Sequence, residues 1–118
     1  MSPQEALLVL NAIPGLSGEG IRKLIRIFEQ PDKVLEASEE DLLEQGLGQN
    51  IVTNLVHFQK DKFLESEYLS LRKTGSDVVT SLDEDYPVLL KQITHAPIVL
   101  YIRGNRKLLG SMAINSVR

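Results

Sequence analysis

The sequence predicts a mainly α-helical fold that is followed by the truncated start of an α/β sheet. Three observations indicate this fold. A helix–hairpin–helix pattern occurs twice, apolar residues recur at helical spacing as far as Lys73, and β-branched runs begin only after Gly75. A chain of 118 residues is long enough for one compact domain and a piece of another. We therefore expect a helical tandem-hairpin domain over residues 1–74 and an incomplete α/β domain over residues 75–118.

The first hairpin lies in segment 13–28, which reads IPGLSGEGIRKLIRIF. Residues 4–12 predict a short helix before it, and Pro14 with Gly15 ends that helix. A second helix is expected from about Gly18 to Glu29. Its inward side consists of apolar residues at helical spacing, Ile21, Leu24, Ile25 and Phe28. The opposite side is a basic helix face formed by Arg22, Lys23 and Arg26.

The same pattern returns 31 residues later in the chain. Pro31 is expected to begin a short third helix, and Ser38 to cap a fourth one that reads EEDLLEQ. The turn that follows repeats the first one, because Gly46, Leu47 and Gly48 align with Gly15, Leu16 and Ser17. The apolar positions after it, Val52, Leu55 and Val56, fall where Ile21, Leu24 and Ile25 fell. This is an internal repeat.

The helix after the second turn is expected to be long, from about Gln49 to Lys73. Its inward side would consist of seven apolar residues, Val52, Leu55, Val56, Phe63, Leu64, Tyr68 and Leu71. Thr74 and Gly75 supply a helix stop.

Beyond Gly75 the spacing of apolar residues changes. Residues 77–82, DVVTSL, predict a strand, and an acidic turn over 83–85 follows. Residues 86–93 predict a short helix with Pro87 in its first turn. Residues 98–102 predict a second strand, bounded by Pro97 and Gly104, and residues 112–114 predict the beginning of another. The order of these elements indicates an α/β sheet that is cut off near its start.

Composition and charge exclude several classes of protein. The chain has no cysteine, which excludes disulfides, thiolate catalysis and cysteine zinc sites. It shows no signal peptide or membrane span, and we expect a cytoplasmic protein. No catalytic set, phosphate loop or metal-ligand spacing is present, so neither an enzyme nor a cofactor is expected. The net charge is −3, and residues 1–74 hold eight Lys and Arg against twelve Asp and Glu. A DNA contact would therefore depend on a local basic patch.

The tandem hairpins resemble the helix-hairpin-helix modules of DNA repair and recombination proteins. The candidate turn residues are the glycines Gly15, Gly18, Gly46 and Gly48. In that family the turn offers backbone N–H groups to a phosphate, and the basic helix face of Arg22, Lys23 and Arg26 would support such a contact. The first turn has Ser17 in place of the second glycine, and the second turn has acids upstream and no Lys or Arg before Lys60. An alternative is that both turns only pack helix pairs together.

The tail carries a more specific resemblance. Residues 86–105, YPVLLKQITHAPIVLYIRGN, together with Asp83, are similar to the entry segment of the DNA-processing protein A family, also called DprA or Smf. That family places a sterile-alpha-motif-like helical domain before a Rossmann-like domain. The resemblance implies a protein that binds single-stranded DNA and loads a RecA-type recombinase onto it during natural transformation. The chain would then be the N-terminal part of such a protein.

The resemblance and the local charge together select the DNA-binding candidates of the tail. Arg103, Arg106 and Lys107 cluster around the turn at Gly104. Arg118 stands where the family has a DNA-contacting arginine, although Ser116 replaces the glycine expected before it. Two alternatives stay open. The helical domain could be a protein docking or homodimerisation module without DNA contact, or the chain could begin a nucleotide-handling Rossmann protein.

Overall fold

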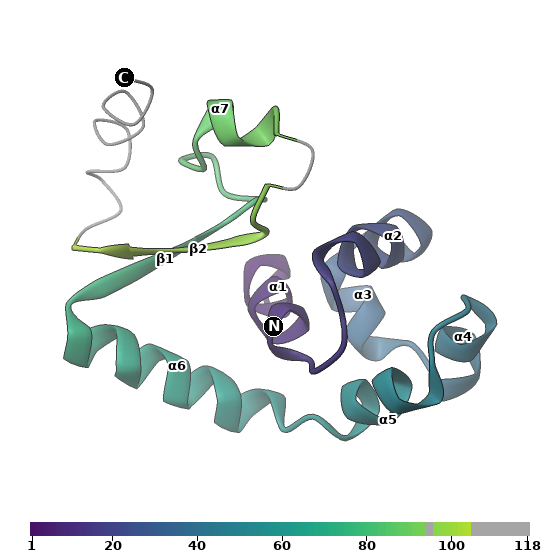
Figure 1. Ribbon diagram of the computed structural model, residues 1–118. Helices are drawn as coiled ribbons and strands as arrows, with labels where there is room; N and C mark the ends of the chain where they lie inside the picture. The colour runs from purple at the N-terminus through teal and green to yellow at the C-terminus, as the bar shows by residue number, and fades with distance from the viewer. Residues whose placement is uncertain (94–95, 105–118) are drawn as a thin grey trace. The chain divides into compact units, whose positions relative to one another are not determined.

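The computed structural model describes residues 1–93 and 96–104 (Figure 1). The chain divides into two compact units, Met1–Leu64 and Glu65–Arg118. In the described residues the fold is mainly helical, with a two-stranded antiparallel sheet in the second unit. The expected combination of helices followed by strands is confirmed at this level.

The first unit is built from short helices, three of which are capped by a serine. They are α1 (Pro3–Ala12), α2 (Gly18–Phe28), α3 (Pro31–Glu36), α4 (Glu39–Glu44), α5 (Gln49–His57) and the beginning of α6 (Lys60–Thr74). The Ser2, Ser17 and Ser38 side chains each accept a hydrogen bond from a backbone N–H of the helix that they precede. Such a cap stabilises a helix by about 1 kcal/mol. The predicted cap at Ser38 is confirmed.

Helix α1 forms the centre of this unit. Its five consecutive residues from Ala6 to Leu10 are all buried. A helix that is apolar on all sides must be surrounded, and α1 packs against α2 and α3. Other fully buried side chains of this unit come from the following helices, Ile21, Leu24, Val34, Leu42, Val52 and Leu55. Ile21, Leu24, Val52 and Leu55 are at predicted inward positions.

The prediction of one long helix from Gln49 to Lys73 is wrong. Helix α5 ends at His57, Phe58 adopts an extended conformation, and α6 begins at Lys60. The Phe58 ring packs against the Phe63 ring, with 5.4 Å between the ring centroids. Two residues expected to point inward, Val56 and Tyr68, are exposed.

The two hairpin turns share their backbone conformation. Gly15 and Gly46 have φ values of +85° and +86°, in the left-handed region that favours glycine. Only the first turn is covered. A Cβ on Gly15 would lie 3.3 Å from Cγ1 of Ile51, and the Asn54 side chain donates a hydrogen bond to the Pro14 carbonyl oxygen at 3.3 Å. Helix α5 therefore packs over the first turn.

The second unit contains β1 (Ser76–Thr80), the one-turn helix α7 (Val88–Lys91) and β2 (Val99–Arg103). The strands pair antiparallel, with Ser76 opposite Arg103 and Thr80 opposite Val99. The predicted order of strand, short helix and strand is confirmed, although α7 is shorter than residues 86–93. The predicted strand over 112–114 lies outside the described residues.

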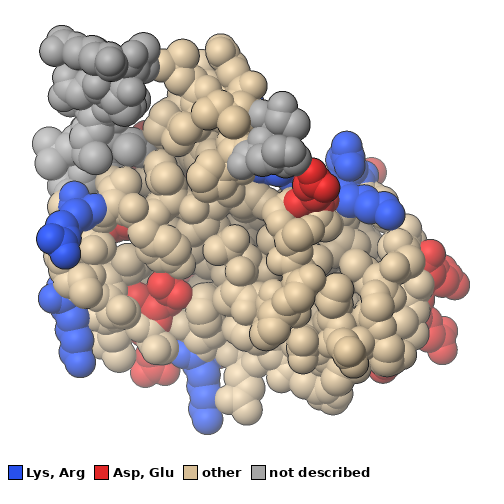
Figure 2. Space-filling model, viewed as in Figure 1, with Lys and Arg blue, Asp and Glu red and all other residues tan. Residues whose placement is uncertain are grey.

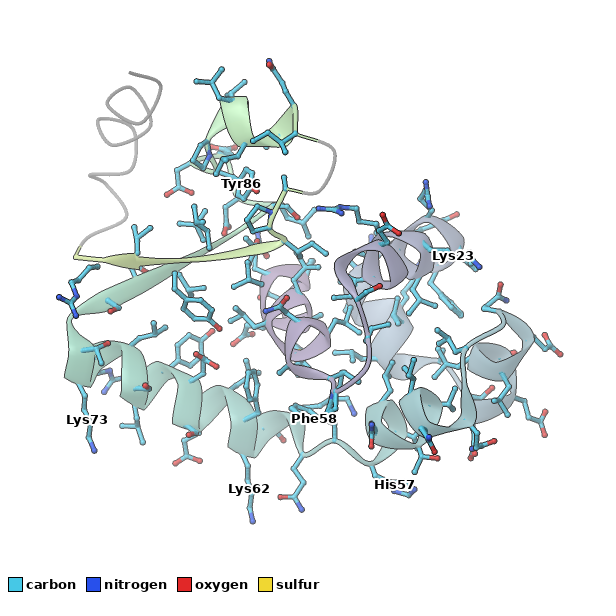
Figure 3. All side chains as sticks on the ribbon, in the orientation of Figure 1. Lys23, His57, Phe58, Lys62, Lys73 and Tyr86 are labelled. Atoms are coloured by element: carbon cyan, nitrogen blue, oxygen red, sulfur yellow. The ribbon has the colours of Figure 1, made fainter. Side chains whose placement is uncertain are left out.

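A small core holds the two strands and the connecting segment together. Val79, Tyr86 and Ile102 are buried against one another, and Leu90 and Leu100 pack around them. The Tyr86 hydroxyl donates a hydrogen bond to the Pro97 carbonyl oxygen at 2.6 Å. Figure 3 shows Tyr86 between α7 and the strands. Tyr86 therefore ties the beginning of the segment between β1 and β2 to its end at Pro97.

On the edge of β1 that faces away from β2, two carboxylates accept the backbone N–H groups. Bonds from Ser81 N to Ile98 O and from Gly104 N to Gly75 O fix the ladder. Because hydrogen-bonded pairs alternate in an antiparallel ladder, the N–H groups of Val78 and Thr80 point outward. Asp77 Oδ1 accepts the first of these at 2.8 Å, and Asp83 Oδ2 accepts the second at 2.7 Å. Side chains on such an edge hinder pairing with another strand.

Gly15 and Gly46 allow a matched test of whether α5 packs over the first turn. Alanine at either position would cost about 1–2 kcal/mol, because an L-residue is strained in the left-handed region. Nothing lies within 4 Å of a Cβ on Gly46, whereas Gly15 faces Ile51. We expect Gly15→Ala to lower the free energy of unfolding more than Gly46→Ala, measured by urea denaturation. Equal losses would show that α5 yields to the added methyl group.

The carboxylate of Asp83 can be tested in the same way. It accepts hydrogen bonds from the Thr80 N–H and from the Thr80 hydroxyl, and Thr80 is buried. Removing an acceptor from a buried donor costs about 1–3 kcal/mol. We expect Asp83→Ala to cause a loss of this size in thermal unfolding, whereas Glu84→Ala, at the exposed next position, should change little. A loss no larger than that of the control would contradict the role of Asp83.

Candidate nucleic-acid interface

The basic helix face lies on α2, as the sequence predicts. Lys23 and Arg26 are exposed and Arg22 is half-buried. In Figure 3 the Lys23 side chain points away from the helices of its unit. Figure 2 shows Lys and Arg side chains gathered beside acidic ones over this region. Glu19 precedes Lys23 by one helical turn, so its carboxylate lowers the positive potential of the face.

The starts of α2 and α5 differ in how their N–H groups are used. At α2 the Ser17 hydroxyl accepts the Gly20 N–H at 3.1 Å, so part of the helix start is capped by the protein itself. At α5 the N-cap is Gly48, and no side chain caps the helix. The cations of the first hairpin and the uncapped N–H groups of the second therefore belong to different turns.

The second hairpin is also surrounded by acids. Glu39, Glu40 and Asp41 fill the first turn of α4. The Gln49 side chain donates a hydrogen bond to Glu39 Oε1 at 3.0 Å, which brings this carboxylate to the start of α5. A phosphate near Gly46 and Gly48 would be repelled. Among the predicted turn residues, Gly15 and Gly18 are the ones that lie near cations.

The tail candidates are only partly described by the structure. Arg103 is exposed and is the last residue of β2. Gly104 follows it with a φ of +94° and donates a hydrogen bond to the Gly75 carbonyl oxygen at 2.7 Å. Arg106, Lys107, Ser116 and Arg118 lie outside the described residues.

Four of the residues that carried the family resemblance build the structure of the second unit. Asp83 closes the β1 edge, Tyr86 forms the small core, and Pro97 supplies the carbonyl oxygen that Tyr86 binds. Pro87 is buried directly before α7. These side chains explain why the segment folds as it does, and a nucleic acid would have to contact other residues.

Sequence reasoning missed a tyrosine–carboxylate pair in the second unit. Tyr101 on β2 is half-exposed, and its hydroxyl is hydrogen-bonded to Glu67 on α6. Burial, the Glu67 charge and this hydrogen bond raise the pKa of Tyr101 to about 12. The sequence held no signal for the pair, because it depends on how α6 lies along the sheet.

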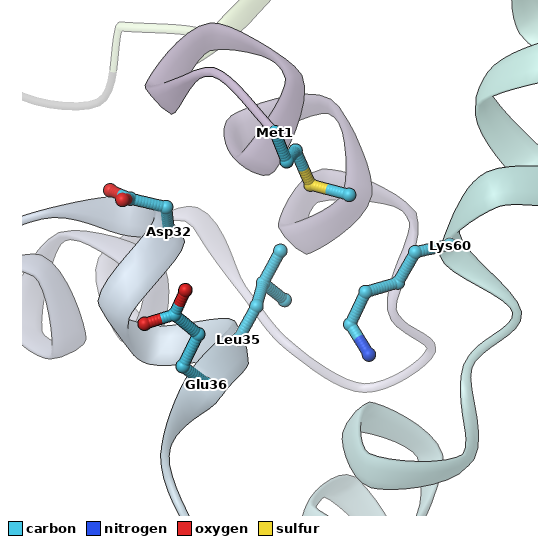
Figure 4. Close-up of a pocket in the computed structure, with 5 residues that line it drawn as sticks. All are labelled: Met1, Asp32, Leu35, Glu36 and Lys60. Atoms are coloured by element: carbon cyan, nitrogen blue, oxygen red, sulfur yellow. The ribbon is translucent and has the colours of Figure 1, made fainter.

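A pocket of about 290 Å³ lies in the first unit and is lined by Met1, Asp32, Leu35, Glu36 and Lys60. Figure 4 shows Met1 and Lys60 reaching toward Leu35 of α3. Asp32 Oδ1 is buried without a hydrogen-bond partner among the described residues. The lining combines two acids with one lysine, an arrangement that does not favour a phosphate.

Within residues 1–93 and 96–104, no three His, Asp or Glu side chains come close enough together to hold a metal ion. None of the helices in the same range is long and apolar enough to cross a membrane.

Comparison with known proteins supports the resemblance of the tail. Residues 77–117 match the model of a family described as DNA recombination-mediator protein A. The resemblance to this family is confirmed for the C-terminal part of the chain, and the match leaves out residues 1–76. No curated protein and no solved structure matches the chain.

The Tyr101–Glu67 pair gives a prediction for pH. The ordinary tyrosine pKa is 10.0, and the folded value is raised to about 12. Because the folded state favours the protonated phenol, the stabilisation is present below pH 10 and is lost as pH rises through about 12. We expect the ring carbon signal of Tyr101 to titrate near pH 12 in NMR. Glu67→Gln should lower that midpoint without restoring 10, since burial is the larger cause. An unchanged midpoint would contradict the pairing.

Proposed function

We propose that the chain is the N-terminal part of a DprA-like protein, which binds single-stranded DNA and delivers it to a RecA-type recombinase during DNA uptake. The single observation that carries this proposal is the match of residues 77–117 to the recombination-mediator family. The structural roles of Asp83 and Tyr86 support it, because they give a physical reason why these two residues occur in this segment.

The proposal includes two domains. Residues 1–74 would be a helix-hairpin-helix, sterile-alpha-motif-like domain, and residues 75–118 would be the beginning of a Rossmann-like domain. The matching φ values of Gly15 and Gly46 support the tandem hairpins, since both turns use the same backbone conformation. The antiparallel pair of β1 and β2 is compatible with the edge of a larger sheet.

The helical domain would add only a weak DNA contact through its basic helix face. Lys23 and Arg26 are exposed, but residues 1–74 hold more acids than bases. Affinity for a phosphate backbone rises with the number of phosphates that are neutralised. Three cations beside Glu19 support binding in low salt that is lost as salt is added. The role is one of binding rather than catalysis, and it requires no cofactor.

A docking function is the second candidate, and exposed apolar side chains favour it. Leu82, Val88, Leu89 and Ile93 of the second unit are each about half exposed or more. Apolar groups gathered around one short helix are typical of surfaces that another protein covers. A partner protein or a second copy of this chain could bind there without any DNA contact.

Fluorescence anisotropy with a labelled oligothymidylate at low salt tests the proposed function. We expect weak binding by the whole chain that falls steeply as salt is added. Replacing Arg22, Lys23 and Arg26 together by alanine should weaken it severalfold. The matched control replaces Lys33, Lys62 and Lys91, three exposed lysines on separate helices, by alanine.

The outcomes separate the two candidate functions. Binding that drops equally in both triple variants would show that net charge, rather than the basic helix face, is responsible. No binding at any salt concentration, together with self-association in light scattering, would favour the docking function. Replacing Val88 and Leu89 by serine should then abolish the association.

A further inference from the structure

Basic residues from two distant segments begin from neighbouring backbone positions at one end of the sheet. Arg72 and Lys73 are in the last turn of α6, and Arg103 ends β2. Ser76, three residues after Lys73, pairs with Arg103, and the Gly104 N–H binds the Gly75 carbonyl oxygen. We name Arg72, Lys73 and Arg103 the basic sheet end. Figure 2 shows Lys and Arg side chains at the side of the molecule where Figure 1 shows α6 and β2 ending.

Local hydrogen bonds hold the backbone that presents these cations. The Thr74 hydroxyl lies 2.9 Å from the Ser70 carbonyl oxygen and 2.9 Å from the Ser76 hydroxyl. The Gly75 N–H binds the Arg72 carbonyl oxygen at 3.3 Å, which closes the last turn of the helix. The junction between α6 and β1 is thus tied to the end of β2, and the three basic side chains begin from a defined framework.

The basic sheet end carries an excess of positive charge, and the acid beside its strand face, Glu67, is hydrogen-bonded to the Tyr101 hydroxyl. Segments 68–76 and 96–107 contain no Asp or Glu. The nearest acid along β1 is Asp77, which lies on the opposite face of the sheet because successive strand residues alternate. Its Oδ1 accepts the Val78 N–H. Three positive charges also exceed the partial negative charge of about one half that a helix C-terminus carries.

An aromatic ring lies on the same face as the basic residue of β2. Tyr101 precedes Arg103 by two strand positions, which places the two side chains about 7 Å apart on one face. The Tyr101 ring is half-exposed, and Glu67 holds its hydroxyl. A nucleic-acid base can stack on such a ring, and stacking on an aromatic side chain contributes about 1–3 kcal/mol per base.

We infer that the basic sheet end binds the phosphate backbone of a single-stranded nucleic acid, with one base stacked on Tyr101. The inference rests on the proposed function for the class of ligand, but it uses residues outside the basic helix face. A single strand fits better than a duplex because its unpaired bases are accessible to the ring. Arg103 would bind a phosphate beside the stacked base, and Arg72 and Lys73 would bind neighbouring phosphates.

The test measures binding of labelled oligothymidylate to the whole chain in which Arg72, Lys73 and Arg103 are replaced by alanine. We expect affinity at low salt to fall about tenfold or more, and the slope of log affinity against log salt to lose about two units, or 0.7 for each phosphate contact. The Lys33, Lys62 and Lys91 triple variant has the same net charge and should keep most of the affinity. Circular dichroism checks that each variant is folded.

The stacking of a base on Tyr101 is tested separately. Tyr101→Phe keeps the ring and removes the bond to Glu67, so we expect it to retain binding. Tyr101→Ser should weaken binding of the oligonucleotide but leave binding of inorganic polyphosphate unchanged. If Tyr101→Ser weakened both ligands equally, the tyrosine would support the framework rather than a base.

Comparison with the basic helix face separates this inference from the proposed function. If only the Arg22, Lys23 and Arg26 variant loses oligonucleotide affinity, the proposed function stands and the inference fails. If only the basic-sheet-end variant loses it, the inference is supported and the contact by α2 is wrong. Absence of binding in the unsubstituted chain would contradict both. Preference for duplex over single strand at equal salt would overturn the choice of ligand.

Discussion

The hydrogen bond from the Tyr86 hydroxyl to the Pro97 carbonyl oxygen is the interaction on which the second unit depends. Two antiparallel strands alone are marginally stable in water. Tyr86 adds a buried ring against Val79 and Ile102, and each such side chain contributes about 1.5–3 kcal/mol by leaving water. Its hydroxyl also fixes the segment that joins the strands. Asp83 completes this arrangement by binding the outward N–H of Thr80.

Local chemistry could be predicted from the sequence more reliably than contacts between elements. The cap at Ser38, the glycine turns and the strand predicted over 98–102 follow from residue types at fixed spacing. The structure contains the cap and the turns, and it has the strand at Val99–Arg103. The break at Phe58 could not be predicted in this way. Residues 49–73 keep a helical pattern throughout, and it is the contact between the Phe58 and Phe63 rings that accompanies the interruption.

The same difference separates the two groups of basic residues that are candidates for nucleic-acid contact. The basic helix face follows from the spacing of Arg22, Lys23 and Arg26 within one helix. The basic sheet end does not, because Lys73 and Arg103 are brought together only by the pairing of Ser76 with Arg103. The family pattern itself lies on residues that build the small core. Similarity to the family therefore reports in large part how this segment folds, and of the basic sheet end only Arg103 lies within the matched residues 77–117.

Amide hydrogen exchange of the whole chain tests whether the residues of the family pattern hold the two strands in place. The outward N–H groups of Val78 and Thr80 are bonded to Asp77 and Asp83. The outward N–H groups of Tyr101 and Arg103 have no such acceptor in the described part of the chain. We expect the Thr80 amide to exchange much more slowly than the amides of Tyr101 and Arg103. Equally fast exchange at all three would contradict it.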